Sequence, residues 1–245
     1  MKKEKLFIST IAEDAVPVAR EYGLGLEIAE YCTAWNMDDR FAQTDAAVRS
    51  KLDGIPNRVF HAPFNELFPC AIDPKARELA AYRYRQAIDL AKGYSAAKVI
   101  IHGGFHPEIY YPVWYTGESV RFWQEFLKED PGVEIVLENV LEDEPGMLLD
   151  IVKRVENPRI RLCLDIGHVN AYSRISAMDW LEACAGCISH FHIHNNDGSR
   201  DTHSDLNRGT VLVKELLDRA EVLCPDATYT LEVTGARPSV RWLLG

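Results

Sequence analysis

Short apolar runs alternate with amphipathic segments along the whole chain. Eight runs are rich in Val, Ile, Leu and Phe and mostly lack polar alternation, as buried parallel strands do: Leu6–Ile8, Leu24–Ile28, Arg58–Phe60, Lys98–Ile101, Glu134–Leu137, Ile160–Leu164, Ile188–Ile193 and Thr228–Leu231. We therefore predict one strand at each run.

Segments with helical spacing of apolar residues separate these runs. They are Ala15–Tyr22, Asp73–Tyr94, Glu118–Leu127, Met147–Val155, Met178–Cys184, Val211–Ala220 and Pro238–Leu244. Asp14 and Asp73 stand where the caps of the first two helices are expected, and Gly23 is a stop signal. Ser176 and Asp179 have the spacing of a capping box.

Strands that alternate with helices in this way predict an α/β fold, a single closed (β/α)8 TIM barrel. The 245 residues suit one such domain, spanning residues 1–245. An open α/β sheet that binds a nucleotide is the alternative. Neither a GxGxxG nor a GxxxxGKS/T phosphate loop is present, and His102 is followed by only two glycines.

Composition limits where in the cell the protein is expected to act and which partners it is expected to bind. No run of about 18 apolar residues exists, and the N-terminal apolar run is too short for a signal peptide, so a cytoplasmic protein is expected. The six cysteines are expected to be reduced, and the pair Cys184 and Cys187 has no second pair to form a zinc site. A net charge of −10 argues against broad polyanion binding, although bound cations would reverse the field locally.

Residues that bind divalent metals follow the predicted strands repeatedly. The nine candidates are His61, His102, Glu138, Asp165, His168, His194, Asp201, His203 and Glu232. In a closed parallel barrel the carboxyl ends of the strands share one rim, where active sites lie. The sequence therefore predicts a centre for one or more divalent metal ions on this rim.

Neighbouring residues allow other interpretations. A strand-end Glu such as Glu138 would otherwise need an ion pair, for example with Arg161, because an isolated buried carboxylate is costly. His190 and His192 alternate with His194 and share its strand face. We interpret these two as packed interior residues or groups that orient a ligand. His106 is interpreted as a surface or substrate-loop residue.

The order of these motifs carries a family resemblance. HAPF, a His after the fourth strand, EN after the fifth, DxxH after the sixth, HxND followed by DxH, and a final Glu extend from about Leu6 to Glu232. This series resembles the xylose isomerase-like barrel superfamily, which includes endonuclease IV of AP endonuclease family 2, sugar isomerases and sugar phosphate isomerases and epimerases.

The resemblance implies two different ligand sets. In the endonuclease IV pattern, His61 and His102 would share one metal with a bridging Glu138. A second metal would lie among Glu138, Asp165, His194 and Glu232, and a third among His168, Asp201 and His203. The epimerase pattern needs only the middle set, whose two glutamates would also act as the acid–base pair on the two faces of a sugar.

We expect a metal-dependent isomerase or epimerase of a small sugar or sugar derivative, using Mn, Mg or Co. The alternative is an endonuclease IV-like phosphodiesterase with two to three zinc ions, and a second alternative is a non-catalytic barrel that binds sugar or metal. Nucleic acid is not the favoured partner, because phosphate contacts need basic residues and the rim offers few beyond Arg174, Arg200 and Arg208. Substrate contacts are expected from four residues: Phe64, Tyr111, Trp114 and Arg208.

Overall fold

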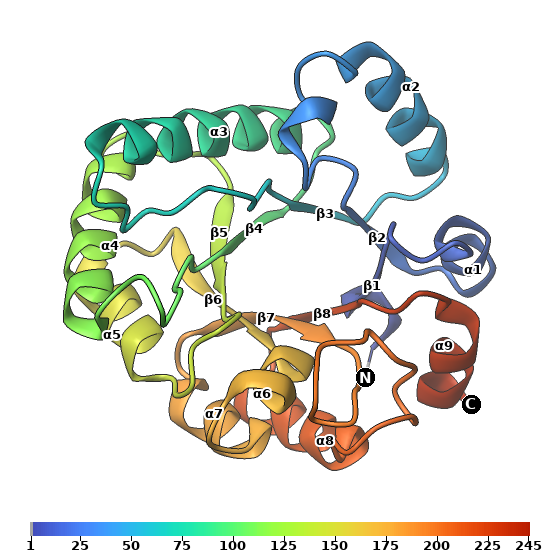
Figure 1. Cartoon of the computed structure of the whole chain (residues 1–245). Helices are drawn as coiled ribbons and strands as arrows, with labels where there is room; N and C mark the ends of the chain where they lie inside the picture. Colours follow the sequence, from blue (N-terminus) through green and yellow to red (C-terminus); the bar gives the residue numbers. More distant parts are fainter. Residues whose placement is uncertain (1) are drawn as a thin grey trace.

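Parallel strands close into one ring in the computed structural model, which describes residues 2–245 (Figure 1). The strands are β1 (Leu6–Ser9), β2 (Gly25–Ile28), β3 (Arg58–His61), β4 (Lys98–His102), β5 (Glu134–Glu138), β6 (Ile160–Asp165), β7 (Ile188–Ile193) and β8 (Thr228–Leu231). Each pairs with the next, and β8 returns to β1, where Leu6 lies opposite Tyr229. The predicted barrel and its eight strands are confirmed.

The helices form an outer layer around the ring of strands (Figure 1). They are α1 (Ala15–Tyr22), α2 (Phe41–Leu52), α3 (Pro74–Gly93), α4 (Pro112–Phe126), α5 (Gly146–Val155), α6 (Ile166–Tyr172), α7 (Ala177–Cys184), α8 (Val213–Leu223) and α9 (Ala236–Leu244), with 3-10 turns η1 (Lys3–Lys5) and η2 (Ala34–Asn36). None of the helices between residues 2 and 245 is long and apolar enough to cross a bilayer.

Three helices differ from the sequence prediction. Helix α2 was not predicted, and among its residues only Val48 and Leu52 are buried, so its apolar periodicity is weak. Helix α6, a seven-residue segment that directly follows β6, was also not predicted. Helix α4 begins at Pro112, six residues before the expected Glu118. Proline suits this first position because its missing N–H would have no partner there.

Helix caps follow the sequence signals with one correction. The Asp73 side chain accepts the backbone N–H of Lys75, and Ser176 forms the predicted capping box. Gly23 ends α1 in the left-handed region, at φ 72°. Asp14 makes no side-chain cap on α1, because its carboxylate instead accepts the backbone N–H groups of Ala236 and Arg237 at the start of α9.

The side chains inside the barrel form layers, because every second residue of a strand points to the same side. A small apolar cluster fills the middle of the barrel: Phe7, Val59, Ile100, Val136 and Cys163. Residues two positions further along β3, β4, β5 and β6 point to the same side, because side chains alternate across a strand. Those next positions are His61, His102, Glu138 and Asp165. The apolar cluster is therefore the floor beneath the predicted metal ligands.

Candidate metal centre

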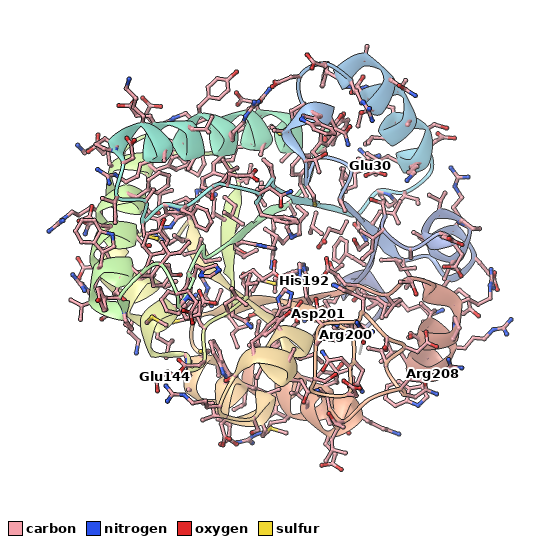
Figure 2. The ribbon with its side chains drawn as sticks, viewed as in Figure 1. Glu30, Glu144, His192, Arg200, Asp201 and Arg208 are labelled. Atoms are coloured by element: carbon pink, nitrogen blue, oxygen red, sulfur yellow. The ribbon has the colours of Figure 1, made fainter. Side chains whose placement is uncertain are left out.

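The strand ends bring a dense set of carboxylates and imidazoles together at the barrel mouth. One subset comprises Glu138, Asp165, His192 and Glu232, whose ligand atoms all lie within 4.8 Å of one another. We call these four buried residues the inner group. His192 Nδ1 lies 3.1 Å from Glu138 Oε1 and 3.4 Å from Glu232 Oε2. Figure 2 shows His192 near the middle of the ring.

His192 is held by a residue that the sequence analysis did not select. Its Nε2–H donates to Glu27 Oε2 at 3.1 Å, and Glu27 is fully buried on β2. This bond leaves Nδ1 directed at the inner carboxylates, the arrangement in which a carboxylate orients a metal-binding imidazole. The sequence signal for His192 was the alternation of histidines, HxH, on β7. His192 is the last histidine of this series within the strand, and His194 lies beyond it.

His194 therefore occupies a different place from the one predicted. The expected set joined it to Glu138, Asp165 and Glu232, but His192 takes that position. His194 instead belongs with His168, Asp201 and His203, whose ligand atoms also lie within 4.8 Å of one another. We call these four residues the outer group. The two histidines fall into different groups because β7 ends at Ile193, so that His192 lies within the strand and His194 just beyond it.

A third subset lies beside the inner group, and it matches the predicted pairing. His61 Nε2 is 3.4 Å and His102 Nε2 is 3.5 Å from Glu138 Oε2. His61 Nδ1 lies 2.8 Å from the carbonyl oxygen of Ala62, which leaves Nε2 available to a cation. The Phe64 ring stacks on His102 with ring centroids 4.3 Å apart. Glu138 is thus common to this subset and the inner group.

Several buried polar atoms in these groups make no hydrogen bond within the described chain. They are both carboxylate oxygens of Glu138, Nδ1 of His192, Nδ1 of His194 and Oδ1 of Asp201. A buried polar atom left without a partner costs about 1–3 kcal/mol, and more when it is charged. Divalent cations would satisfy all of them, and imidazole nitrogen with carboxylate oxygen suits Zn, Co and Mn. The residues present therefore fit bound metal ions.

The two inner glutamates differ in their ionisation. Burial raises the pKa of Glu232 to about 7, and the charges of Glu27 and Glu138 add to this effect while His192 opposes it. Burial alone would also raise the pKa of Glu138, but His192 and His102 hold it well below its usual value. One carboxylate is therefore ionised at neutral pH and the other is close to half-protonated.

Arg161 does not form the ion pair considered as an alternative for Glu138. Its Nη2–H donates to the carbonyl of Ile188 at the opposite end of the barrel. Among the described residues, Glu138 instead forms ion pairs with imidazoles, including those of His61 and His168. A structural Arg–Glu pair is therefore not the reason for this buried glutamate.

The expected substrate residues lie at different depths. Phe64 contacts the imidazoles of His61 and His102, whereas Tyr111 is 84% exposed at the start of α4. The Trp114 indole N–H donates to the carbonyl of Cys70 and joins α4 to the loop between β3 and α3. Arg208 Nε lies 3.5 Å from Asp205 Oδ2. In Figure 2, Arg208 lies near α9, away from the centre of the ring.

The two cysteines of the CxxC pair are not joined by a disulfide. Cys184 and Cys187 are both free thiols, and Cys184 is buried at the end of α7. Burial raises the pKa of the Cys184 thiol to about 12, so its reactive thiolate is scarce at neutral pH.

The chain matches one known protein family over most of its length. The family model for the xylose isomerase-like TIM barrel matches residues 18–243. The chain belongs to this family. Among curated proteins it is similar to MJ1311 of Methanocaldococcus jannaschii, with 29% identity over 194 residues, 75% of this chain and 66% of the relative. MJ1614 of the same organism is 23% identical over 62% of this chain and 61% of its own. The chain thus spans slightly less than two thirds of the length of both relatives.

Solved structures share the fold over almost the whole chain. A D-tagatose 3-epimerase-like protein superposes with a TM-score of 0.77 and 24% identity, covering 97% of this chain and 93% of its own. The TTHB071 protein of Thermus thermophilus, soaked with ZnCl2, gives 0.75 and 24%, covering 98% and 96%. D-allulose 3-epimerase of a Methylomonas species, in complex with D-allulose, gives 0.72 and 18%, covering 95% and 85%. At these identities the likeness establishes the fold.

Proposed function

We propose that the protein is a metal-dependent isomerase or epimerase of a small sugar, working by proton transfer between carboxylates. The observation that carries the proposal is the inner group. Glu138 and Glu232 approach the same nitrogen of His192, yet one is ionised and the other has a pKa of about 7. Two carboxylates whose environments separate their pKa values are suited to act as base and acid.

The inner group would hold one cation through Glu138, Asp165, His192 and Glu232. When bound, the cation would polarise a sugar oxygen and so acidify the neighbouring C–H. Glu138, being ionised, takes the proton from that carbon, and the C–H bond breaks. Glu232 in its protonated form returns a proton to the carbon from the other face. The proton count is unchanged and the carbon is inverted.

The mouth beside this pair is suited to a small polyol. The stacked rings of Phe64 and His102 form an apolar wall next to Glu138, against which a sugar carbon chain can pack. We propose Phe64 as the nearest substrate contact, with Tyr111, Trp114 and Arg208 contributing from further out on the rim. The epimerase relative solved with D-allulose supports a ketose as the substrate class.

Deuterium exchange tests this function directly. The purified protein, loaded in turn with Mn, Mg, Co and Zn, is incubated with a panel of ketohexoses and ketopentoses in heavy water. We expect deuterium to enter at the carbon beside the carbonyl and an epimer or isomer to form. NMR and chromatography measure both. Absence of exchange with every metal and every ketose would contradict the proposal.

One observation supports a phosphodiesterase as the second candidate. His61 and His102 approach the same oxygen of Glu138, so a second cation there would share this carboxylate with the first. Paired cations stabilise the attacking and leaving oxygens in phosphoester cleavage. Cleavage of a duplex with an abasic site by the zinc-loaded protein would favour this candidate. Ketose binding with neither reaction would favour the non-catalytic barrel.

A further inference from the structure

The acidic charge of the molecule is concentrated on the face that carries the metal centre. The connecting segments on the side of the strands' carboxyl ends, called here the rim loops, are residues 10–14, 29–40, 62–73, 103–111, 139–145, 173–176, 194–212 and 232–235. They contain 15 acidic and 4 basic residues, a net charge of −11 with histidine counted as neutral. The other 22 acidic and 23 basic residues nearly cancel, so the rim loops account for the net charge of the chain, −10.

Metal ions at the centre would leave most of this charge in place. Two divalent ions would offset four buried carboxylates: Glu27, Glu138, Asp165 and Glu232. Of these only Glu232 lies in the rim loops, so 14 acidic residues remain there against 4 basic ones. Glu30 and Glu144 show the spread of this charge, because they lie on opposite sides of the ring (Figure 2). Such a field repels anions that approach the mouth, over about 8 Å at physiological ionic strength.

The basic residues of the rim are few and partly neutralised. Proteins hold phosphate groups with Lys, with the guanidinium fork of Arg, or with the free N–H groups of a helix N-terminus. The rim loops contain no lysine. Two of their four arginines already contact carboxylates, because Arg174 pairs with Asp143 and Arg208 Nε lies 3.5 Å from Asp205 Oδ2. Few cations therefore remain at the mouth to bind a phosphate.

A common phosphate position of this fold is occupied by a side chain of the protein itself. In TIM barrels the phosphate of a ligand frequently lies beside the loops after strands 7 and 8, at a helix N-terminus. Here the helix after β8 is α9, which begins four residues after Glu232. Its first N–H groups donate to the Asp14 carboxylate, from Ala236 to Oδ1 at 2.6 Å and from Arg237 to Oδ2 at 3.1 Å. Asp14 thus accepts the hydrogen bonds that this helix N-terminus would offer to a phosphate.

We propose that the substrate of the inner group is a free ketose, and that the acidic rim loops and Asp14 exclude its phosphate ester. The inference rests on the proposed isomerase or epimerase function and narrows the substrate class within it. An uncharged polyol experiences little of the field of the rim. A phosphate ester carries a charge of about −1.5 to −2 at pH 7 and meets like charge at the mouth. The same field opposes the polyanionic backbone of a DNA duplex.

Matched pairs of substrates test the inference. The metal-loaded protein is assayed with D-ribulose, D-fructose and D-tagatose, and with the terminal phosphate ester of each, by deuterium exchange and epimer formation. We expect kcat/KM for each ester to be at least about 100-fold below that of the free sugar, because like charges that face each other oppose binding. Raising the ionic strength should narrow this gap by screening the field and should leave the free sugars unaffected. An ester used as well as its free sugar would overturn the proposal.

Two neighbouring variants separate the role of Asp14 from that of the general field. Asp14→Ala and Glu13→Ala each remove one acidic residue from the same rim loop, but only Asp14 binds the start of α9 through its side chain. We expect Asp14→Ala to raise kcat/KM for the phosphate esters more than Glu13→Ala does, with little change for the free sugars. Equal gains in the two variants would refute the role assigned to Asp14.

Inorganic phosphate provides a measurement that does not depend on turnover. Amide NMR of the full-length, metal-free protein follows the N–H signals of Ala236 and Arg237 as phosphate is added at constant ionic strength. We expect no shift in the parent or in Glu13→Ala, and a saturable shift in Asp14→Ala. A saturable shift in the parent would contradict the proposal even if the sugars react as expected. The expected NMR result without reaction of any sugar would count against the proposed function, and not against the closed phosphate position.

Discussion

Glu138 is shared by the inner group and by the subset that contains His61 and His102. We expect Glu138→Gln to retain the fold and to reduce bound metal, because the neutral amide replaces a carboxylate shared by His61, His102 and the inner group. Turnover should fall by at least about 10²–10⁴, the usual contribution of a general base. Metal analysis, circular dichroism and the exchange assay measure these effects. Glu125→Gln on exposed α4 is the control, and equal loss in both would show that Glu138 has no special role.

Glu27 tests whether the orientation of His192 matters. Glu27→Gln removes the charge that accepts the His192 Nε2–H while leaving a group of the same shape. We expect metal affinity to fall about 10–100-fold, as for other residues that orient a metal-binding imidazole. Competition with a chelator measures the affinity, and nitrogen NMR of the His192 ring reports its tautomer. Unchanged affinity and ring shifts would remove Glu27 from the site.

Metal loading should release protons at neutral pH. Burial alone would lower the pKa of His168, but Asp165, Asp201 and Glu138 raise it well above its usual value, and the pKa of Glu232 is about 7. Both groups therefore carry protons in the metal-free protein, and ligands must lose them to bind a cation. We expect affinity to fall as pH decreases below 7. Titration calorimetry in buffers of different ionisation enthalpy counts the protons, and a count of zero would contradict the assignment.

At the scale of the elements, Asp14 connects the first and last helices of the ring. Its carboxylate accepts two backbone N–H groups at the start of α9. We expect Asp14→Ala to reduce the free energy of unfolding by about 1 kcal/mol, the usual cost of losing a helix cap. Urea denaturation measures this, with exposed Glu13→Ala as the control. A loss no greater than in the control would mean that water replaces the cap.

The elements also show where sequence patterns are informative. Helix α3 was predicted within a residue or two at each end, because Asp73 and Pro74 mark its start and its apolar spacing is regular. Helix α2 was missed because its burial rests on Val48 and Leu52, too few to set a period. Asp14 looked like a cap for the helix that follows it, but the closed ring brings α9 within its reach. Local signals cannot report a partner more than two hundred residues away.

At the scale of the whole molecule, Gly25 allows the barrel interior to pack. A Cβ at this position would lie 2.4 Å from Phe7 Cδ1 and 2.9 Å from the carbonyl oxygen of Asn57. We expect Gly25→Ala to destabilise the protein by about 1–3 kcal/mol through overpacking. Denaturant unfolding measures the change, with Gly117→Ala as the control, since nothing lies within 4 Å of the added group there. Equal stability of the two variants would show that the residues around Gly25 accommodate the added methyl group at little cost.

The sequence by itself determined the strands, the barrel and the rim on which the ligands lie. It could do so because strand period and strand–helix alternation are local properties, and parallel strands in a closed ring direct their carboxyl ends to one side. Glu138, Asp165 and Glu232 were recognised in this way, each at or just beyond a strand end.

Only the tertiary structure decided which ligands meet. Whether His192 or His194 joins the inner carboxylates depends on the residue at which β7 leaves the barrel, and the run of three alternating histidines does not reveal that residue. Glu27 reaches His192 across the barrel from β2, 165 positions away in sequence. The outer group forms because the loop after β7 folds back at a strained His203. Ligand grouping is a matter of distances across the ring, and those distances are set only when the ring closes.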